Sequence, residues 1–289
     1  MAFGSFGDFW GLVHDLKDEI GKDRVLAVAA GVTFHAILAL VPAITAMISI
    51  FGLVLEPAEV PQTLASVTGL MPGEAATLLT DQATRIAAKE DGSLSLTALV
   101  ALVIALWSAN GGTKALIEAL GIAYDVEETR GFVKLNLVAL GFTLAGIVAV
   151  IVVGAIVAVL PFLAERLGGV AGDAMLALRW PILFALLLAA LAAIYRWAPN
   201  RPDAEWVWIT PGAVVAAVGL IATSAGLAWY VSSFGSYDET YGSLAAVVIL
   251  MLWIWLSTVM VLIGAEVNAE MDRRKRVRVS GRFQPARQG

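Results

Sequence analysis

The residues of this sequence that could carry chemistry are isolated polar and charged side chains set in long apolar stretches. The chain has no cysteine and 2 histidines, which excludes disulfides, cysteine-ligated metals and thiol chemistry. At a helical rise of about 1.5 Å per residue, His35 lies about 13 Å into the first apolar stretch, where a polar group needs a partner. His35 is then either a proton-linked or substrate-contacting group, or a neutral histidine hydrogen-bonded to another helix.

Small and polar residues line one face of the apolar stretch from 26 to 55 and of a later stretch from 208 to 234. Their steps of three, four and seven residues place them on one side of a helix. Such a face contacts other helices or a wet cavity rather than lipid. It predicts either helix packing or the lining of a substrate path. The candidate pathway residues on and after these stretches are His35, Thr45, Ser49, Tyr230 and Tyr241.

A second group of candidates follows the apolar stretch from 94 to 113. Asn110 begins an Asn-Gly-Gly step that weakens helical structure, and Lys114 and Glu118 follow four residues apart on one face. An unwound segment of this kind often lines a transporter site. The alternative is an intrahelical ion pair between Lys114 and Glu118.

Glu266 follows a Gly-Ala pair near the end of the last apolar stretch, with Asn268 two residues later. The small pair lets another helix approach and bury the carboxylate, which then needs a cation. We expect Lys114 or Arg130 to supply it, either in a structural salt bridge or in a substrate site. We also expect Glu266→Gln to cost more than Glu270→Gln.

A basic cluster follows the last apolar stretch. Basic residues beside a membrane span bind anionic headgroups, at about 1 kcal/mol per residue near the surface. Nucleic-acid binding is the weaker interpretation, because the tail has little aromatic content. The predicted headgroup contacts are Arg273, Arg274, Lys275 and Arg276.

The elements that must position these groups are membrane helices. The chain has 289 residues, of which 59% are hydrophobic and 15% charged, whereas soluble domains carry about 25% charged residues. The mean hydropathy is +0.82. We therefore predict an all-α, polytopic integral membrane protein that forms one domain with six transmembrane helices. The expected spans are residues 26–55, 94–113, 135–163, 180–198, 208–234 and 243–267.

Three flanking segments complete this prediction. Residues 3–22 have an apolar stripe at three- and four-residue steps, which predicts an amphipathic helix in the membrane interface. Residues 56–93, with 6 acids and 2 bases, predict a folded helical cap outside the membrane. Residues 271–289 form a basic tail. The N-terminus lacks signal-peptide features, so we expect the first span to act as an uncleaved signal anchor.

The distribution of basic residues predicts the orientation. With six spans, 15 Lys and Arg lie on the side of both termini and 4 on the other side. Because cytoplasmic segments of membrane proteins carry the excess of basic residues, we expect both termini in the cytoplasm and the cap in the periplasm.

Five segments resemble the BrkB/YihY family of bacterial inner-membrane proteins, once labelled ribonuclease BN. They are AAGVTFHAILALVPA at 29–43, WSANGGTKALIEALGIAYDVEETRGF at 107–132, YRWAPN at 195–200, ITPGA at 209–213 and YGSLAAVVILMLWIWLSTVMVLIGAEVNAE at 241–270. Where relatives commonly have an aromatic pair, this chain has Thr33-Phe34-His35. The resemblance implies a six-helix fold in the bacterial inner membrane and a transport role.

Two functional hypotheses follow. The first is a transporter or flippase-like exporter of a lipid or another amphiphile, with membrane lipids as partners. The second is a non-transporting scaffold or assembly factor that contacts envelope proteins through residues 56–93. The sequence contains no phosphate-binding glycine loop, GxSxG or HExxH motif. We therefore expect no enzyme activity, cofactor, metal or nucleic-acid ligand, and the ribonuclease label finds no support in the residues.

Overall fold

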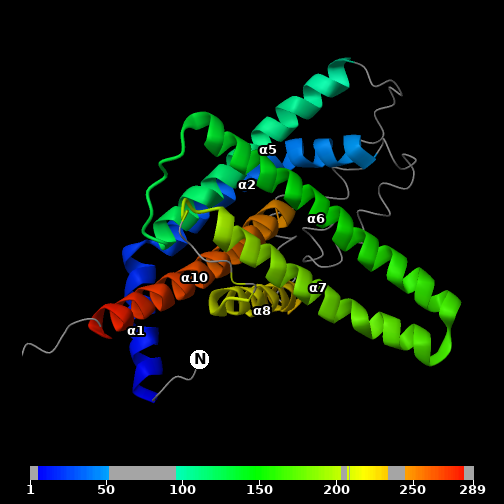
Figure 1. Cartoon of the computed structure of the whole chain (residues 1–289). Coiled ribbons are helices and arrows are strands. Elements are labelled where there is room, and N and C mark those ends of the chain that lie inside the picture. Colours follow the sequence, from blue (N-terminus) through cyan, green and yellow to red (C-terminus); the bar gives the residue numbers. More distant parts are fainter. Residues whose placement is uncertain (1–5, 52–95, 203–206, 208, 234–244, 283–289) are drawn as a thin grey trace, which may run out of the picture.

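The computed structural model describes residues 6–51, 96–202, 207, 209–233 and 245–282. These residues form α-helices with short connections and no β-strand, so the all-α prediction is confirmed for this part of the chain. The predicted cap at 56–93 and the end of the basic tail lie outside it. The helices (Figure 1) are α1 (Phe6–Lys22), α2 (Val25–Phe51), α5 (Leu96–Ala123), α6 (Phe132–Leu167), α7 (Gly169–Trp197), α8 (Pro211–Ser233) and α10 (Ala245–Arg282).

Several of these helices are long and apolar enough to cross a membrane. Within the described residues, 4 segments meet this criterion, and a shorter apolar helix covers Val25–Ala39 at the start of α2. The long segments are Phe132–Leu167, Gly169–Trp197, Pro211–Ser233 and Ala245–Arg276. A bilayer core of about 30 Å needs about 20 apolar residues per helix. The chain is therefore a multi-pass membrane protein.

Helix α5 corrects one expectation. It runs without interruption from Leu96 to Ala123, through the Gly-Gly step that predicted a local unwinding. A Cβ added at Gly112 would lie 3.6 Å from both the Ala36 Cα and the His35 carbonyl oxygen on α2. That distance is an ordinary van der Waals contact, so α5 packs directly against the backbone of α2 at this step. Tertiary packing keeps helical a step that is weak by intrinsic propensity.

Helices α6 and α7 form a long hairpin that projects from the rest of the bundle (Figure 1). Gly168 is the only residue between them, and its φ of 60° lies in the left-handed region that favours glycine. The segment from 164 to 179, expected as a connection between spans, is instead mostly helical. The hairpin therefore has a much tighter turn than the sequence predicted.

The core lies where α2, α5, α7, α8 and α10 meet, and small residues dominate it. Ala29, Ala213 and Ala265 are fully buried within this cluster. At the contact between α8 and α10, a Cβ on Gly212 or on Gly264 would collide with the carbonyl oxygen of the other glycine. Backbones that touch in this way fix the register of the two helices. This contact holds the N-terminus of α8 against the polar end of α10.

Candidate functional site

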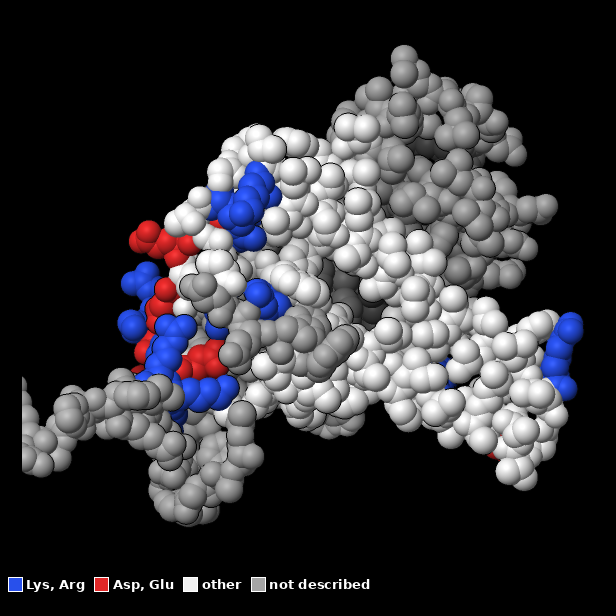
Figure 2. All heavy atoms as spheres, viewed as in Figure 1, with Lys and Arg blue, Asp and Glu red and all other residues white. Residues whose placement is uncertain are grey.

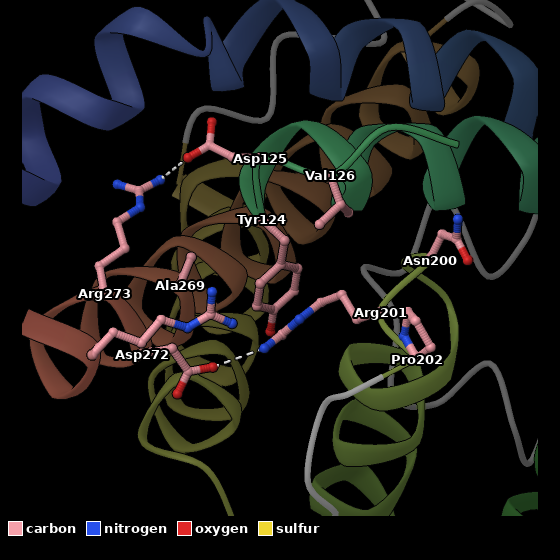
Figure 3. A pocket seen from close by; sticks show the side chains of 10 residues that line it. Tyr124, Asp125, Val126, Asn200, Arg201, Pro202, Ala269, Asp272 and Arg273 are labelled. Carbon is pink, nitrogen blue, oxygen red and sulfur yellow. Dashed lines mark hydrogen bonds and ion pairs between the residues drawn. The ribbon is translucent and has the colours of Figure 1, made fainter. Parts of the chain in front are cut away.

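Charged side chains gather at one end of the face shown in Figure 2, around the polar end of α10. Three segments far apart in the sequence meet there: the end of α5, the segment after α7 and the last turns of α10 (Figure 3). Together they enclose a cavity of about 380 Å³. Its lining residues are Tyr124, Asp125, Val126, Asn200, Arg201, Pro202, Ala269, Asp272, Arg273 and Arg276.

The end of α5 turns sharply to deliver Tyr124 and Asp125 to this cavity. Asp125 has a φ of 51°, a left-handed conformation that aspartate tolerates better than most residues. The Asp125 N–H donates to the Ile122 carbonyl at 3.0 Å, and the Val126 N–H donates to the Gly121 carbonyl at 2.9 Å. These bonds satisfy the carbonyls at the helix end and reverse the chain.

Polar side chains tie this turn to the segment after α7. The Arg130 guanidinium donates to the Ala198 carbonyl at 2.7 Å and pairs with Glu128. Asn200 Nδ2 donates to Thr129 Oγ1 at 2.6 Å. The hydrogen bonds from Arg130 lower the pKa of the Glu128 carboxyl. Arg130, predicted to be a pathway residue, therefore braces two connecting segments.

Arg201 occupies the centre of the cavity wall. Its guanidinium donates to Asp272 Oδ2 at 2.8 Å and lies 4.2 Å from the centroid of the Tyr124 ring. The Arg201 carbonyl accepts a hydrogen bond from Arg196 Nη1 at 3.2 Å. A carboxylate and an aromatic face thus fix the position of a cation at the polar end of the bundle (Figure 3).

Asn268 connects α5, α8 and α10 with a single amide. Its Nδ2 donates to the Tyr124 hydroxyl at 3.2 Å, and its Oδ1 accepts the Gly212 N–H at 2.9 Å. The Gly212 N–H belongs to the first turn of α8, which has no intrahelical partner for it. Burial raises the pKa of Tyr124 to about 12, so its hydroxyl keeps its proton. Asn268 therefore joins three helices and also lines a cavity described below, and its place on a substrate path stays a prediction.

A second cavity, of about 480 Å³, lies beside the first and shares Tyr124, Arg201, Asp272 and Arg276 with it. Its charged lining residues are 4 bases and 1 acid: Arg196, Arg201, Lys275, Arg276 and Asp272. Val207, Ile209, Pro211 and Met271 add apolar surface. The two cavities together, which we call the charged basin, combine excess positive charge with an apolar wall.

The predicted headgroup contacts on α10 have different environments. Arg273 forms ion pairs with Asp125 and Glu19, and Arg274 pairs with Asp15. Both arginines also pair with Glu270. These contacts join α1 to α10, and they already engage the two arginines within the protein. Lys275 and Arg276 are exposed and line the charged basin, where contact with a headgroup stays a prediction.

The expected cations for Glu266 are engaged elsewhere. Lys114 Nζ donates to Asn136 Oδ1 at 3.1 Å and lies 5.8 Å from the centroid of the Trp107 ring, and Arg130 braces the connecting segments. The prediction that either residue pairs with Glu266 is wrong. The reason is the register of the helices: α5 turns Lys114 toward Asn136 on α6, whereas Glu266 faces Asp23 in the turn before α2.

The remaining candidates are dispersed. Asn110 is buried and donates to Asn136 Oδ1 at 3.1 Å, so it shares an acceptor with Lys114. Glu118 is exposed and does not pair with Lys114, which overturns the intrahelical pair. His35 is exposed, with its ring edge-on to Phe34 at 5.6 Å, and Tyr230 is exposed on α8. Outside the description lie the side chains of Thr45 and Ser49 and the whole of Tyr241.

Sequence reasoning missed the residues that form the centre of the basin. Tyr124, Arg201 and Asp272 stand in or next to three of the segments that carry the family resemblance. Each looks like an ordinary polar residue at a helix end. The available signal was the placement of polar motifs such as YRWAPN at the ends of apolar stretches.

Comparison with known proteins gives consistent matches. The ribonuclease-like protein YfkH of Bacillus subtilis is 34% identical over 186 residues, which cover 61% of this chain and 66% of YfkH. A UPF0761 membrane protein of Methylibium petroleiphilum is 26% identical over 261 residues, 88% of this chain and 60% of that protein. A UPF0761 membrane protein of Vibrio cholerae is 38% identical over 111 residues, 38% of this chain and 36% of that protein.

The chain therefore spans between about a third and two thirds of the length of these relatives. No solved structure matches it. The family model described as virulence factor BrkB matches residues 16–289, which include all the segments that form the charged basin. Since that match covers nearly the whole sequence, the chain belongs to the BrkB family of membrane proteins.

Proposed function

We propose that this chain is an inner-membrane transporter or flippase-like exporter whose substrate is an anionic amphiphile, such as a phospholipid. The observation that carries the proposal is the charged basin. In its larger cavity 4 basic residues face 1 acidic residue beside an apolar wall. The proposal involves no catalytic step.

The basin has the chemistry of a phosphate site next to a hydrocarbon surface. Asp272 is the one carboxylate in the lining of the larger cavity, so it cannot neutralise all the cations there. Arginine forms paired hydrogen bonds to phosphate oxygens, and a second arginine or a lysine adds charge. Val207, Ile209 and Pro211 offer apolar contact of the kind an acyl chain needs. A small inorganic anion would use the cations and leave the apolar wall unused.

The topology that we propose places this basin at the cytoplasmic surface. Six spans, with α2 and α5 as the first two, put both termini on the side that carries 15 of the 19 basic residues. The charged basin contains the polar end of α10 and therefore lies on that same side. A substrate headgroup would enter from the cytoplasmic leaflet.

Reconstitution in liposomes tests the proposal. Fluorescent analogues of an anionic and a zwitterionic phospholipid are incorporated, and their movement between leaflets is followed by quenching from outside. We expect faster movement of the anionic analogue, and we expect the Lys275→Gln and Arg276→Gln double variant to slow it. The matched control is Arg166→Gln, an exposed base near the opposite end of α6. Equal rates with and without the protein for both analogues would refute the proposal.

A further inference from the structure

Glu266 is the most deeply buried charged side chain among the described residues. It is 1% exposed, and it lies on α10 between Leu262 and Ala269, which belong to the main core cluster. Its Oε1 has no hydrogen-bond partner. A buried carboxylate oxygen without a donor is costly, because burial removes it from water and nothing replaces the lost hydrogen bonds.

The group that faces Glu266 is a second carboxyl, that of Asp23 in the turn between α1 and α2. Two contacts of α10, one before and one after Glu266 in the sequence, support this placement. Trp255 Nε1 on α10 donates to the Leu26 carbonyl at 3.0 Å, and Arg273 Nη1 pairs with Glu19 Oε1 at 2.9 Å. Asp23 Oδ2 is also buried and also lacks a hydrogen-bond partner. The two carboxyls therefore meet at the junction of α10 with this turn, where Asp23 Oδ2 and Glu266 Oε1 are both buried and neither accepts a hydrogen bond.

Ionised carboxylates are acceptors only, so two of them in contact cannot form a hydrogen bond and repel each other. The cation that acts on Glu266 is Arg273, and Arg273 already forms ion pairs with one carboxylate on α1, one just after α5 and one on α10. Those carboxylates are Glu19, Asp125 and Glu270. A single proton resolves the conflict, because the hydroxyl of one protonated carboxyl donates to an oxygen of the other and the pair then carries one negative charge.

A metal ion is the competing occupant. Metal sites of oxygen ligands need several carboxylates or carbonyls around one point. Within the described residues, no group of three or more His, Cys, Asp or Glu side chains could hold a metal ion. Two carboxyls in contact are enough to hold one proton, but they supply too few ligands for a metal ion.

We propose that Glu266 and Asp23 share one proton, which makes the junction of α10 with the turn between α1 and α2 a proton-binding site. Loss of the proton leaves two adjacent buried negative charges and pushes the turn away from α10. The site lies beside the ion pairs that join α1 to the polar end of α10, so protonation also favours the packed position of α1. The inference is independent of the proposed transport.

Infrared spectroscopy of the full-length protein in detergent tests the inference. A protonated carboxyl has a carbonyl stretch distinct from that of a carboxylate, and we expect this band at neutral pH in the natural protein. Glu266→Gln should remove it. The matched control, Glu270→Gln, should keep it, because Glu270 accepts a hydrogen bond from Arg274 and forms ion pairs with Arg273 and Arg274 instead of contacting a second carboxyl.

Thermal unfolding as a function of pH gives a second measurement. A folded state that holds the shared proton binds more protons than the unfolded chain, so stability falls as pH rises and the proton is lost. We expect Glu266→Gln, which keeps a donor toward Asp23, to fold and to flatten this decline, and Asp23→Asn to do the same if Glu266→Gln fails to fold. The inference is overturned if the natural protein lacks the band, or if either variant keeps the natural pH dependence.

Discussion

Arg201 is the side chain on which the charged basin most depends, and Arg201→Gln tests that dependence. The substitution removes the hydrogen bond to Asp272 Oδ2 at 2.8 Å and the stacking on the Tyr124 ring at 4.2 Å. The Arg201 side chain is 16% exposed and that of Asp272 is 39% exposed. The ion pair is therefore partly shielded from water, but not buried.

The expected cost follows from these contacts. A hydrogen bond to a charged group contributes about 1.5–3 kcal/mol, and a cation–π contact at an exposed site about 0.5–1 kcal/mol. Because water reaches Asp272, we take the lower end of both ranges. The glutamine side chain also keeps some of the packing of the arginine that it replaces. Arg201→Gln should lower the free energy of unfolding by about 2 kcal/mol.

The assay is reversible unfolding in mixed detergent micelles, completed as a double-mutant cycle with Asp272→Asn. A coupling energy of about 1 kcal/mol between the two positions is expected. The internal control is the His14 and Asp18 pair on α1, whose side chains are 76% and 68% exposed. Substitution of His14 by glutamine should change stability by less than about 0.5 kcal/mol. An Arg201 effect as small as this control, or a coupling of zero, would refute the reasoning.

Three further predictions concern packing, pH and topology. Gly264→Ala should cost about 1–3 kcal/mol by overpacking, since its Cβ would collide with α8, whereas Gly226→Ala, with nothing within 4 Å, should be neutral in the same unfolding assay. The lowered pKa of Glu128 contributes stability that is present above its unfolded pKa and is lost as pH falls through the folded pKa. As pH falls into the acid range, the Glu128→Gln variant should therefore lose less thermal stability than the natural protein. An equal loss in both proteins would contradict this. For topology, a cysteine at Glu90 should react with an impermeant maleimide from the periplasmic side and one at Glu127 should not; the reverse pattern would invert the orientation.

Glutamine substitution at two positions of α10 separates the sequence argument from the structural one. The sequence predicted that Glu266→Gln costs more than Glu270→Gln, because it placed a cation beside Glu266. In the structure Glu270 contacts two arginines, while Glu266 faces the Asp23 carboxyl. We now expect the opposite order, with Glu270→Gln the more costly change. The residue types were recognised correctly, and the partners were not.

The sequence by itself determined the class of the molecule. Long apolar stretches with few charges can only be membrane helices or buried core, and their number and length exclude a soluble domain. It also determined the family, because the motifs occur in the right order over nearly the whole chain. The class and the family both depend on the types and spacing of residues that lie close together in the chain. Composition, periodicity and motifs can be read directly from the sequence.

Only the tertiary structure decided which polar groups meet. Arg201 and Asp272 are 71 residues apart, and Asn268 and Tyr124 are 144 residues apart, yet each pair forms a hydrogen bond in the charged basin. Gly212 and Gly264 let the backbones of α8 and α10 approach more closely than a side chain would allow, which helps to place Asn268 against the start of α8. The register of one helix against another depends on the packing of all the small residues along the contact. Because no local pattern encodes that register, the partners of Lys114 and Glu266 could not be read from the sequence.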